Sequence, residues 1–362
     1  MSLRPGDGPV VHRAADGAGR AAHSGSRSRA CTLVRAAADR QHGVVTRRDL
    51  QRAGISDQEI RTRVARGEWV RLRRGAYIAA ADLAAARSRH RRHVIACRAV
   101  LLTLGRDSAV VGGLSAAVVW GLPLPAGPDP EVTLLDPTQT MRGPGFRMSM
   151  APMPPDAATE HDGLPVTSLA RTVADCARLE RFDHAMVIAD AARWDDRLPS
   201  ADLAAVVAGM QGWRGAAAAR CVAELCRAGV ESPLETRVRL RLLASGIVEP
   251  ELLVTIRVDG RAIEADGWWA DAAVVMECDG RVKYREPWGG LTTEQKHWEE
   301  KRRAEVAGAA GVRFWRVAEE DLRSDAAWAA AVARLEAMLA HPLPGPRRFT
   351  VTHEPRRVRR AS

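Results

Sequence analysis

The sequence has few aromatic residues and no long hydrophobic run. Phe, Trp and Tyr together make up 4% of its 362 residues, and no stretch approaches the roughly 20 apolar residues that a membrane-spanning helix needs. Residues 1–30 are rich in Gly, Ala, Ser and Arg and lack the apolar run of a secretory signal. We therefore expect a cytoplasmic protein with no membrane partner, and a disordered tail over residues 1–30.

Cysteine is scarce, and its spacing argues against a structural zinc site. The six cysteines are scattered without the paired spacing that such a site requires. A chain of this length also needs no disulfides to hold its core. We expect reduced thiols at all six positions, which are Cys31, Cys97, Cys176, Cys221, Cys226 and Cys278.

Basic residues outnumber acidic ones. The chain has 54 Lys and Arg against 44 Asp and Glu, a net charge of +10, and almost all of the positive charge is arginine. The planar guanidinium group suits phosphates and guanine edges, so this balance favours a polyanionic partner. A high-GC coding sequence is the alternative source of so much Ala and Arg. The length predicts two or three domains, and the patterns described below predict a multidomain chain of the α/β class.

Residues 31–82 have the pattern of a winged helix-turn-helix. Three short helices come first: Thr46 is placed to cap the second, and Ser56 with Glu59 forms a capping box for the third. Segment 69–78 then alternates apolar and basic residues around a glycine turn, as a β-hairpin wing does.

This module is strongly basic, with eleven arginines and five acidic residues between positions 31 and 80. We expect its third helix to lie in the major groove of DNA and its wing to meet phosphates. The residues expected nearest to the bases are Gln58, Arg61 and Thr62, and those expected on phosphates are Arg71, Arg73 and Arg74. The alternative for such a module is a contact with another protein.

The segment "GVVTRRDLQRAGISDQEIRTRVARGEWVRLRRGAYI" resembles the N-terminal winged helix of AbiEi-type antitoxins from type IV toxin-antitoxin systems. The resemblance implies promoter binding, transcriptional repression and a cognate toxin as partner. In the mixed α/β middle region, residues 83–215, "GGLSAAVVWGLPLP" and "LPVTSLARTVADCARL" are similar to the second part of the same proteins. We interpret this region as a scaffold or a regulatory surface. Its polar residues His161, Asp162, Asp175 and Asp190 are expected on solvated helix faces.

Residues 216–340 predict a further module: a helix, three strands, a helix, a strand and a final helix. The opening helix begins at Ser232, with Pro233 in its first turn. Asp259 and Gly260 predict a tight hairpin between the first two strands. The strands are expected over residues 252–258, 262–270, 272–280 and 312–317, and the middle helix over 293–310.

Four carboxylates recur in the segment "IEADGWWADAAVVMECDG" of this module. If the chain turns at Ala270 and Asp271, the two-residue period of a strand places Glu264, Asp266, Glu277 and Asp279 on one face of the sheet. Opposed carboxylates repel, and oxygen ligands suit Mg²⁺ or Mn²⁺, so a divalent cation is expected there. The alternative is an acidic patch neutralised by arginines such as Arg281, Arg302 and Arg303. A turn of odd length would shift the register and remove the argument.

The segments "SPLETRVRLRLL", "ADGWW", "VVMECDGRVKY" and "EEKRRAEVAGAAGVRFWRV" resemble, in this order, the PD-(D/E)xK nucleases related to very-short-patch repair endonucleases. The resemblance implies a restriction-endonuclease-like α/β/α domain that hydrolyses DNA phosphodiesters with Mg²⁺ or Mn²⁺. The implied metal ligands are Glu235, Asp266 and Glu277, with Asp279 assisting, and the implied catalytic residues are Asp266, Glu277, Glu235 and Lys283. In this sequence Asp279 stands at the position of the family's E-x-K lysine, a departure that favours a non-catalytic role. Glu235 is equally explained as a helix cap with Ser232.

Two functions follow from these patterns. One is an Mg²⁺-dependent DNA endonuclease delivered by a winged helix, in defence or toxin-antitoxin biology. The other is a non-catalytic antitoxin-like regulator whose nuclease fold has decayed. Residues 341–362 are expected to be a disordered basic tail that attracts nucleic acid. The DNA target and the oligomeric state stay open.

Overall fold

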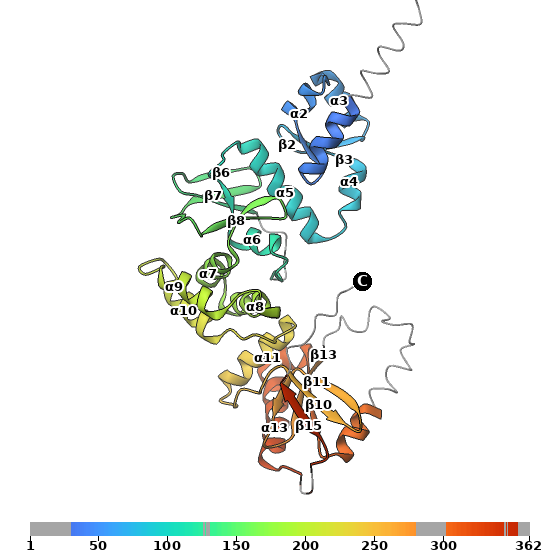
Figure 1. Cartoon of the computed structure of the whole chain (residues 1–362), viewed down its shortest axis with the longest axis vertical. Coiled ribbons are helices and arrows are strands. Elements are labelled where there is room, and N and C mark those ends of the chain that lie inside the picture. Colours follow the sequence, from blue (N-terminus) through green and yellow to red (C-terminus); the bar gives the residue numbers. More distant parts are fainter. Residues whose placement is uncertain are drawn as a thin grey trace, which may run out of the picture. The chain divides into compact units, whose positions relative to one another are not determined.

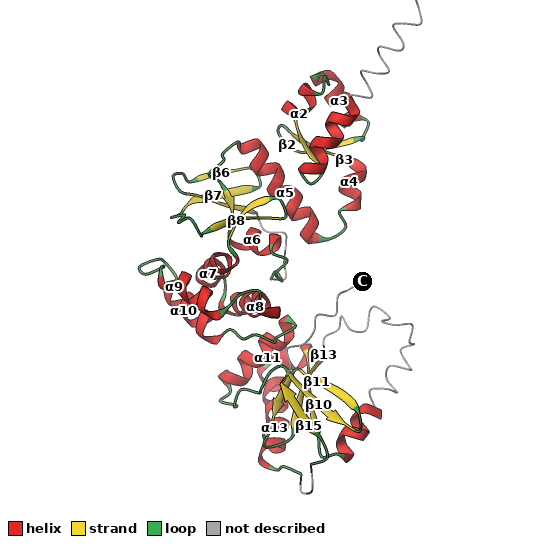
Figure 2. Cartoon of the chain, viewed as in Figure 1, coloured by secondary structure: helices red, strands yellow, loops and turns green. Residues whose placement is uncertain are grey.

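The computed structural model describes residues 30–125, 127, 131–279, 302–343, 345 and 347–353. The chain divides into two compact units. Figures 1 and 2 draw the described helices and strands. The first unit combines residues 1–111, 129–153 and 160–166, and the second combines residues 112–128, 154–159 and 167–362. The predicted middle region is therefore shared between both units, and the boundaries expected at residues 83 and 215 do not coincide with this division. No helix in the described ranges is long and apolar enough to cross a membrane.

The first unit begins with the predicted winged helix. Its elements are a helix over residues 30–40, β1 (Val44–Thr46), α2 (Arg47–Arg52), α3 (Asp57–Ala65), β2 (Trp69–Arg73) and β3 (Ala76–Ala79). The strands form an antiparallel sheet in the order β1-β3-β2. Leu50, Ile60 and Trp69 are buried in one cluster, so the apolar positions of the sequence form the core of this module.

A six-stranded sheet follows, and most of it belongs to the same unit; Ala158, Thr159 and Thr167 are assigned to the second unit. Helices α4 (Ala80–Ala85) and α5 (Arg89–Leu104) lead to β4 (Val110–Val111), β5 (Val132–Asp136), β6 (Met141–Gly143), β7 (Phe146–Met150), β8 (Ala158–His161) and β9 (Leu164–Thr167). The strand order is β6-β7-β5-β4-β9-β8. Strand β5 is buried along its whole length, and α5 contacts it.

The second unit starts with a group of alanine-rich helices. They are α6 (Gly113–Val119), α7 (Leu169–Leu179), α8 (Phe182–Ala192), the short η1 (Trp194–Asp196), α9 (Ser200–Ala208) and α10 (Ala216–Leu225). Small side chains such as Ala174 and Ala189 lie fully buried between them. The expectation that Asp175 and Asp190 lie on solvated helix faces is wrong, because their side chains are 2% and 1% exposed and each is paired with arginine.

The rest of the second unit is an α/β module. Its elements are α11 (Pro233–Ala244), β10 (Val254–Val258), β11 (Arg261–Ala265), β12 (Gly267–Trp269), β13 (Val274–Asp279), a helix over residues 302–309, β14 (Arg313–Ala318), η4 (Glu319–Leu322), α13 (Asp325–Ala340) and β15 (Thr350–His353). One core cluster joins the β12-β13-β14 sheet to α11 and α13. A second cluster joins it to β10, β11 and residues 307–312. Among the described residues, the elements follow the predicted alternation of helix, strands, helix, strand and helix, with one more strand than expected before the middle helix and β15 after α13.

Two details of this module differ from the sequence prediction. The single strand expected over residues 262–270 is broken at Asp266, so that β11 and β12 lie in different sheets. Gly267 sits at the break, where an added Cβ would lie 2.9 Å from Pro250 and from Met276. The expected disordered tail is also wrong for β15, whose β-branched residues pair antiparallel with β10.

Candidate nucleic-acid interface

Helix α3 is fixed to the module at its first turn. Ser56 caps it, with its hydroxyl accepting the Glu59 N–H and the Glu59 carboxylate accepting the Ser56 N–H. Arg47, in the first turn of α2, donates to Asp57 at 2.7 Å through Nε. Ile60 is the buried residue of the helix. These contacts fix the angle between α2 and α3 and leave the opposite side of α3 to solvent.

The three residues expected nearest to DNA bases share this solvent side. Gln58 and Arg61 are exposed and Thr62 is half-buried. The Arg61 guanidinium donates to Oε1 of Gln58 at 2.8 Å, and the Thr62 hydroxyl donates to the Gln58 carbonyl at 2.9 Å. The side chains therefore form one polar group on a short helix, which is the geometry that a recognition helix needs.

The wing differs from the prediction at one of its three arginines. Arg71 and Arg74 are exposed. Arg73 is half-buried, and its guanidinium lies 4.9 Å from the centre of the Phe146 ring. Burial lowers the pKa of Arg73. The structure therefore leaves Arg71 and Arg74 free to meet a phosphate and turns Arg73 toward strand β7.

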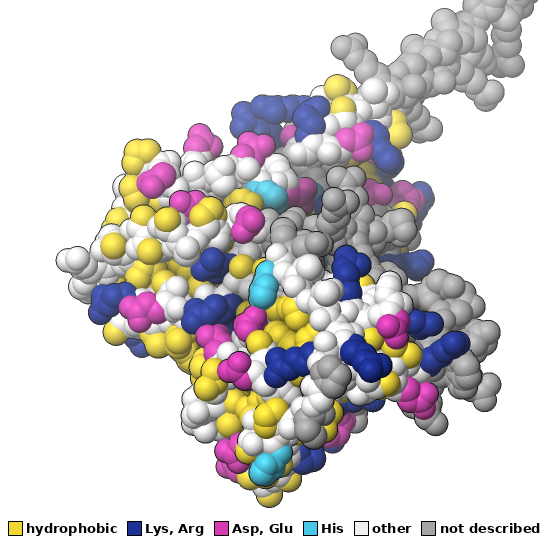
Figure 3. Space-filling model, turned by 60° about the horizontal axis from the view of Figure 1, so that its bottom comes forward, with side chains coloured by type: hydrophobic (Ala, Val, Ile, Leu, Met, Phe, Trp, Pro, Cys, Tyr) yellow, Lys and Arg dark blue, Asp and Glu magenta, His cyan; other side chains and the backbone are white. Residues whose placement is uncertain are grey.

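Helix α2 carries further exposed arginines. Arg48 and Arg52 are exposed, and the sequence interpretation counted them in the charge of the module without giving them a role. Figure 3 shows Lys and Arg side chains interspersed with Asp and Glu over the visible face of the molecule. On this face the charge alone does not single out one surface, and α3 and the wing are distinguished by their exposed polar and basic side chains.

A capped helix pair, an outward polar helix face and a basic β-ribbon define the class of DNA-binding winged helix-turn-helix modules. Residues 33–80 match the family model described as "Transcriptional regulator, AbiEi antitoxin". This match confirms the resemblance for the N-terminal module. No curated protein matches the chain. Among solved structures, the crystal structure of the RV2827C protein from Mycobacterium tuberculosis is similar to 56% of this chain and 82% of its own. The identity is 17% and the TM-score 0.36, values too low to assign a shared fold.

The carboxylates predicted to bind metal in the second unit are only partly brought together. Glu264 lies exposed on β11, in a different sheet from Glu277 and Asp279, so the prediction that all four share one face is wrong. The pairing of β12 with β13 is shifted by two residues, with Gly267 opposite Met276. The turn is longer than expected, and Ala273 within it has a φ of 52°. Lys283 and Arg281 lie outside the described residues.

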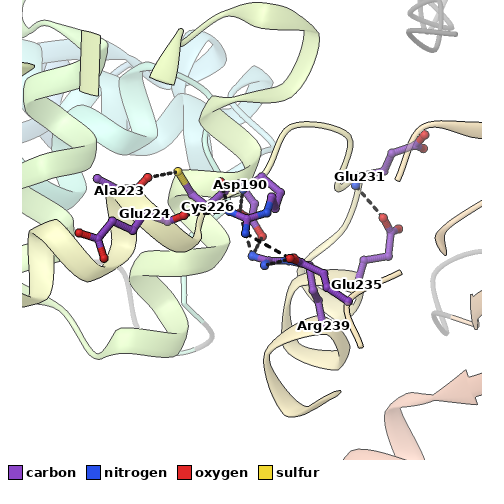
Figure 4. A network of polar contacts seen from close by, with 9 residues as sticks. Asp190, Ala223, Glu224, Cys226, Glu231, Glu235 and Arg239 are labelled. Carbon is purple, nitrogen blue, oxygen red and sulfur yellow. Dashed lines mark hydrogen bonds and ion pairs between the residues drawn. The ribbon is translucent and has the colours of Figure 1, made fainter. Parts of the chain in front are cut away.

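Glu235 and Asp266 are close enough to interact electrostatically. Burial and the neighbouring Asp266 charge raise the pKa of Glu235 to about 7. The Glu235 carboxylate also accepts the Glu231 N–H at 2.7 Å, drawn in Figure 4, and the Ser232 hydroxyl at 2.8 Å. The geometry therefore includes the helix cap that the sequence offered as the alternative. Asp266 accepts the Cys278 N–H at 2.8 Å.

Glu277 is neutralised by arginine. Arg303, on the helix over residues 302–309, donates to one of its carboxylate oxygens, and Arg316 on β14 donates to the other at 3.0 Å. No group of three His, Cys, Asp or Glu side chains within the described ranges is placed to hold a metal ion. Glu235, Asp266 and Glu277 therefore do not fit a divalent cation in this arrangement, because the Glu277 carboxylate already balances the guanidinium groups of Arg303 and Arg316. We therefore derive no hydrolytic step from them.

Proposed function

We propose that this protein is a DNA-binding transcriptional regulator of the AbiEi antitoxin type. The observation that carries the proposal is the outward group of Gln58, Arg61 and Thr62 on a capped helix, within the residues that match the regulator family. Arg61 supplies the donors that read guanine, and the exposed Arg71 and Arg74 bind phosphates beside the groove. A cytoplasmic location and a cognate toxin belong to the same proposal.

Selection of duplexes from a random pool by the full chain tests this function. We expect a recovered consensus, and we expect Arg61→Ala to lose the preference at one base position while binding other DNA. A change at one bidentate contact costs about 1–3 kcal/mol of discrimination. The matched control is Arg220→Ala, which removes an exposed arginine from α10. Recovery of no consensus, with no salt-dependent binding of any duplex, contradicts the proposal.

An Mg²⁺- or Mn²⁺-dependent DNA endonuclease is the second candidate. The observation in its favour is the proximity of Glu235 to Asp266, which raises the pKa of Glu235. For this activity Arg303 and Arg316 must release Glu277. A plasmid-nicking assay of the wild type and of the combined Asp266→Ala and Glu277→Ala variant separates the two functions. Metal-dependent nicking that both substitutions abolish supports the nuclease. We expect no nicking by either protein.

A further inference from the structure

The winged helix is tied to the six-stranded sheet by a pair of turns. His42 follows the first helix and Asp162 lies in the β8–β9 turn, and both have the left-handed backbone conformation that non-glycine residues rarely adopt, with φ of 54° and 47°. The imidazole Nε2 of His42 is 2.7 Å from the Asp162 carbonyl oxygen. Arg91 and Arg98 of α5 reinforce the contact, at His42 Nδ1 and at the Gly163 carbonyl.

A shared core makes a second, apolar link. Ala76 and Ile78 of the wing pack in one buried cluster with Ile95 and Ala99 of α5. Helix α5 also contacts β5 at the centre of the six-stranded sheet. The wing and the sheet are therefore packed against the same helix, and neither moves without disturbing its core.

The third link is the stacking of Arg73 on Phe146. Strand β6 passes beneath the ring at Gly143, where a Cβ would lie 2.3 Å from the Phe146 ring, so that only glycine allows the ring to lie there. Nη1 of Arg73 is buried and has no hydrogen-bond partner among the residues that the structure describes. The Arg73 guanidinium group is instead stabilised by a cation–π interaction with the face of the Phe146 ring. The contact joins the end of β2 to β7, the second strand of the six-stranded sheet.

We propose that the DNA-binding unit of this protein is the winged helix together with α5 and the six-stranded sheet, and that Arg73 is a positioning residue that docks the wing on Phe146. The inference rests on the proposed function. The docked wing carries Arg71 and Arg74 on its exposed surface, so the sheet determines where these two side chains meet the DNA backbone. Phe146, which lies outside the matched residues 33–80, is then part of the DNA-binding apparatus.

The salt dependence of binding tests this division of roles. The full chain is titrated with a fluorescein-labelled DNA duplex of arbitrary sequence over a range of KCl concentrations. Arg73→Met and Phe146→Leu both keep an apolar side chain at the contact, and Arg71→Met is the matched control. Arg71→Met is expected to reduce the slope of log K against log salt by about 0.9, since one phosphate contact is lost. Arg73→Met and Phe146→Leu are expected to weaken binding roughly 5- to 30-fold with the slope unchanged.

Hydrogen exchange of the backbone amides in β2 and β3 provides a reading that does not depend on DNA. Exchange in both strands is expected to be faster in Arg73→Met and in Phe146→Leu, and unchanged in Arg71→Met. A slope that falls as much in Arg73→Met as in the control makes Arg73 a phosphate contact and overturns the inference. Wild-type affinity in both docking variants also overturns it, while the proposed function stands. A wild-type chain that binds no duplex contradicts the proposed function itself.

Discussion

Removal of the buried ion pair between Asp190 and Arg239 is expected to be among the most damaging single changes in the second unit. Asp190 lies on α8 and Arg239 on α11, and the two are drawn together in Figure 4. Arg239 Nη2 lies 3.0 Å from Oδ2 of Asp190, and both side chains are 1% exposed. Arg239 also donates to Glu249 at 2.9 Å, and Asp190 accepts the Arg227 N–H at 2.8 Å. The pair thus joins the helical group to the α/β module.

The magnitude follows from the burial of both charges. Truncation of one partner leaves the other charge desolvated, which costs about 3–5 kcal/mol. Asp190→Ala leaves Arg239 with Glu249. Arg239→Met leaves Asp190 with the Arg227 N–H and the Thr236 side chain. Both losses are therefore expected near the lower end of this range, at about 3 kcal/mol. Replacement of both side chains, by Leu at 190 and Met at 239, removes the charges together. This double variant is expected to lose less than the sum of the single losses.

Urea unfolding of the full chain, followed by tryptophan fluorescence, measures these losses. Asp39→Ala is the matched control, because it removes an aspartate from the exposed pair with Arg35, where the side chains are 63% and 74% exposed. Such a pair contributes little. The reasoning is refuted if Asp190→Ala is no more destabilising than Asp39→Ala. It is equally refuted if the two losses simply add in the double variant.

Three further predictions concern single residues. Burial and Asp266 raise the pKa of Glu235 to about 7, so between about pH 4.5 and 7 the folded state holds a proton that the unfolded state has lost. The free energy of unfolding should therefore fall by about 3 kcal/mol as the pH rises through this range, and then level off. Glu235→Gln should remove this contribution, and equal pH profiles of the two proteins in urea unfolding would argue against it. Gly143→Ala should lower the thermal midpoint, because the added Cβ would lie 2.3 Å from the Phe146 ring. The control is Gly308→Ala in the helix over residues 302–309, where an added Cβ has nothing within 4 Å, so the midpoint should be unchanged or raised. Equal midpoints of the two variants would disprove the close contact. Ser56→Ala should cost about 1 kcal/mol through loss of the α3 cap, and calorimetry that detects no loss would contradict the capping role.

Local signals in the sequence predicted the elements well because each acts within a few residues. The caps of Thr46, Ser56 and Ser232 begin their helices as expected. The hairpin at Asp259 and Gly260 forms with both residues at positive φ. A helix cap or a tight turn depends only on neighbouring backbone groups, so the pattern of residues is sufficient to place it.

Contacts between residues far apart in the sequence could not be predicted from the sequence. Asp190 is 49 residues from Arg239, and nothing in the spacing of α8 shows that an arginine from α11 will cover it. Asp175 offered a better signal, since Arg171 and Arg178 of the same helix lie at i−4 and i+3 and pair with it. Phe146 carried no sequence signal at all for a role beside the wing.

The candidate metal site depended on a register that the sequence leaves open. The extra length of the turn between β12 and β13 shifted the pairing by an even number of residues, which keeps each side chain on its face. The break at Asp266 had a larger effect, because it moved Glu264 into another sheet. Arg316 faces Glu277 across the parallel β13–β14 pair, a neighbour that only the sheet order reveals.

The most direct test of α3 as the recognition helix compares two affinities for the selected duplex. One is the affinity of the full chain, and the other is that of a variant in which Gln58, Arg61 and Thr62 are all replaced by Ala. The account predicts that the variant binds the selected duplex no better than an unrelated one, while Arg220→Ala on α10 retains the wild-type preference. A variant that keeps the full preference for the selected duplex would contradict the assignment of α3 as the recognition helix.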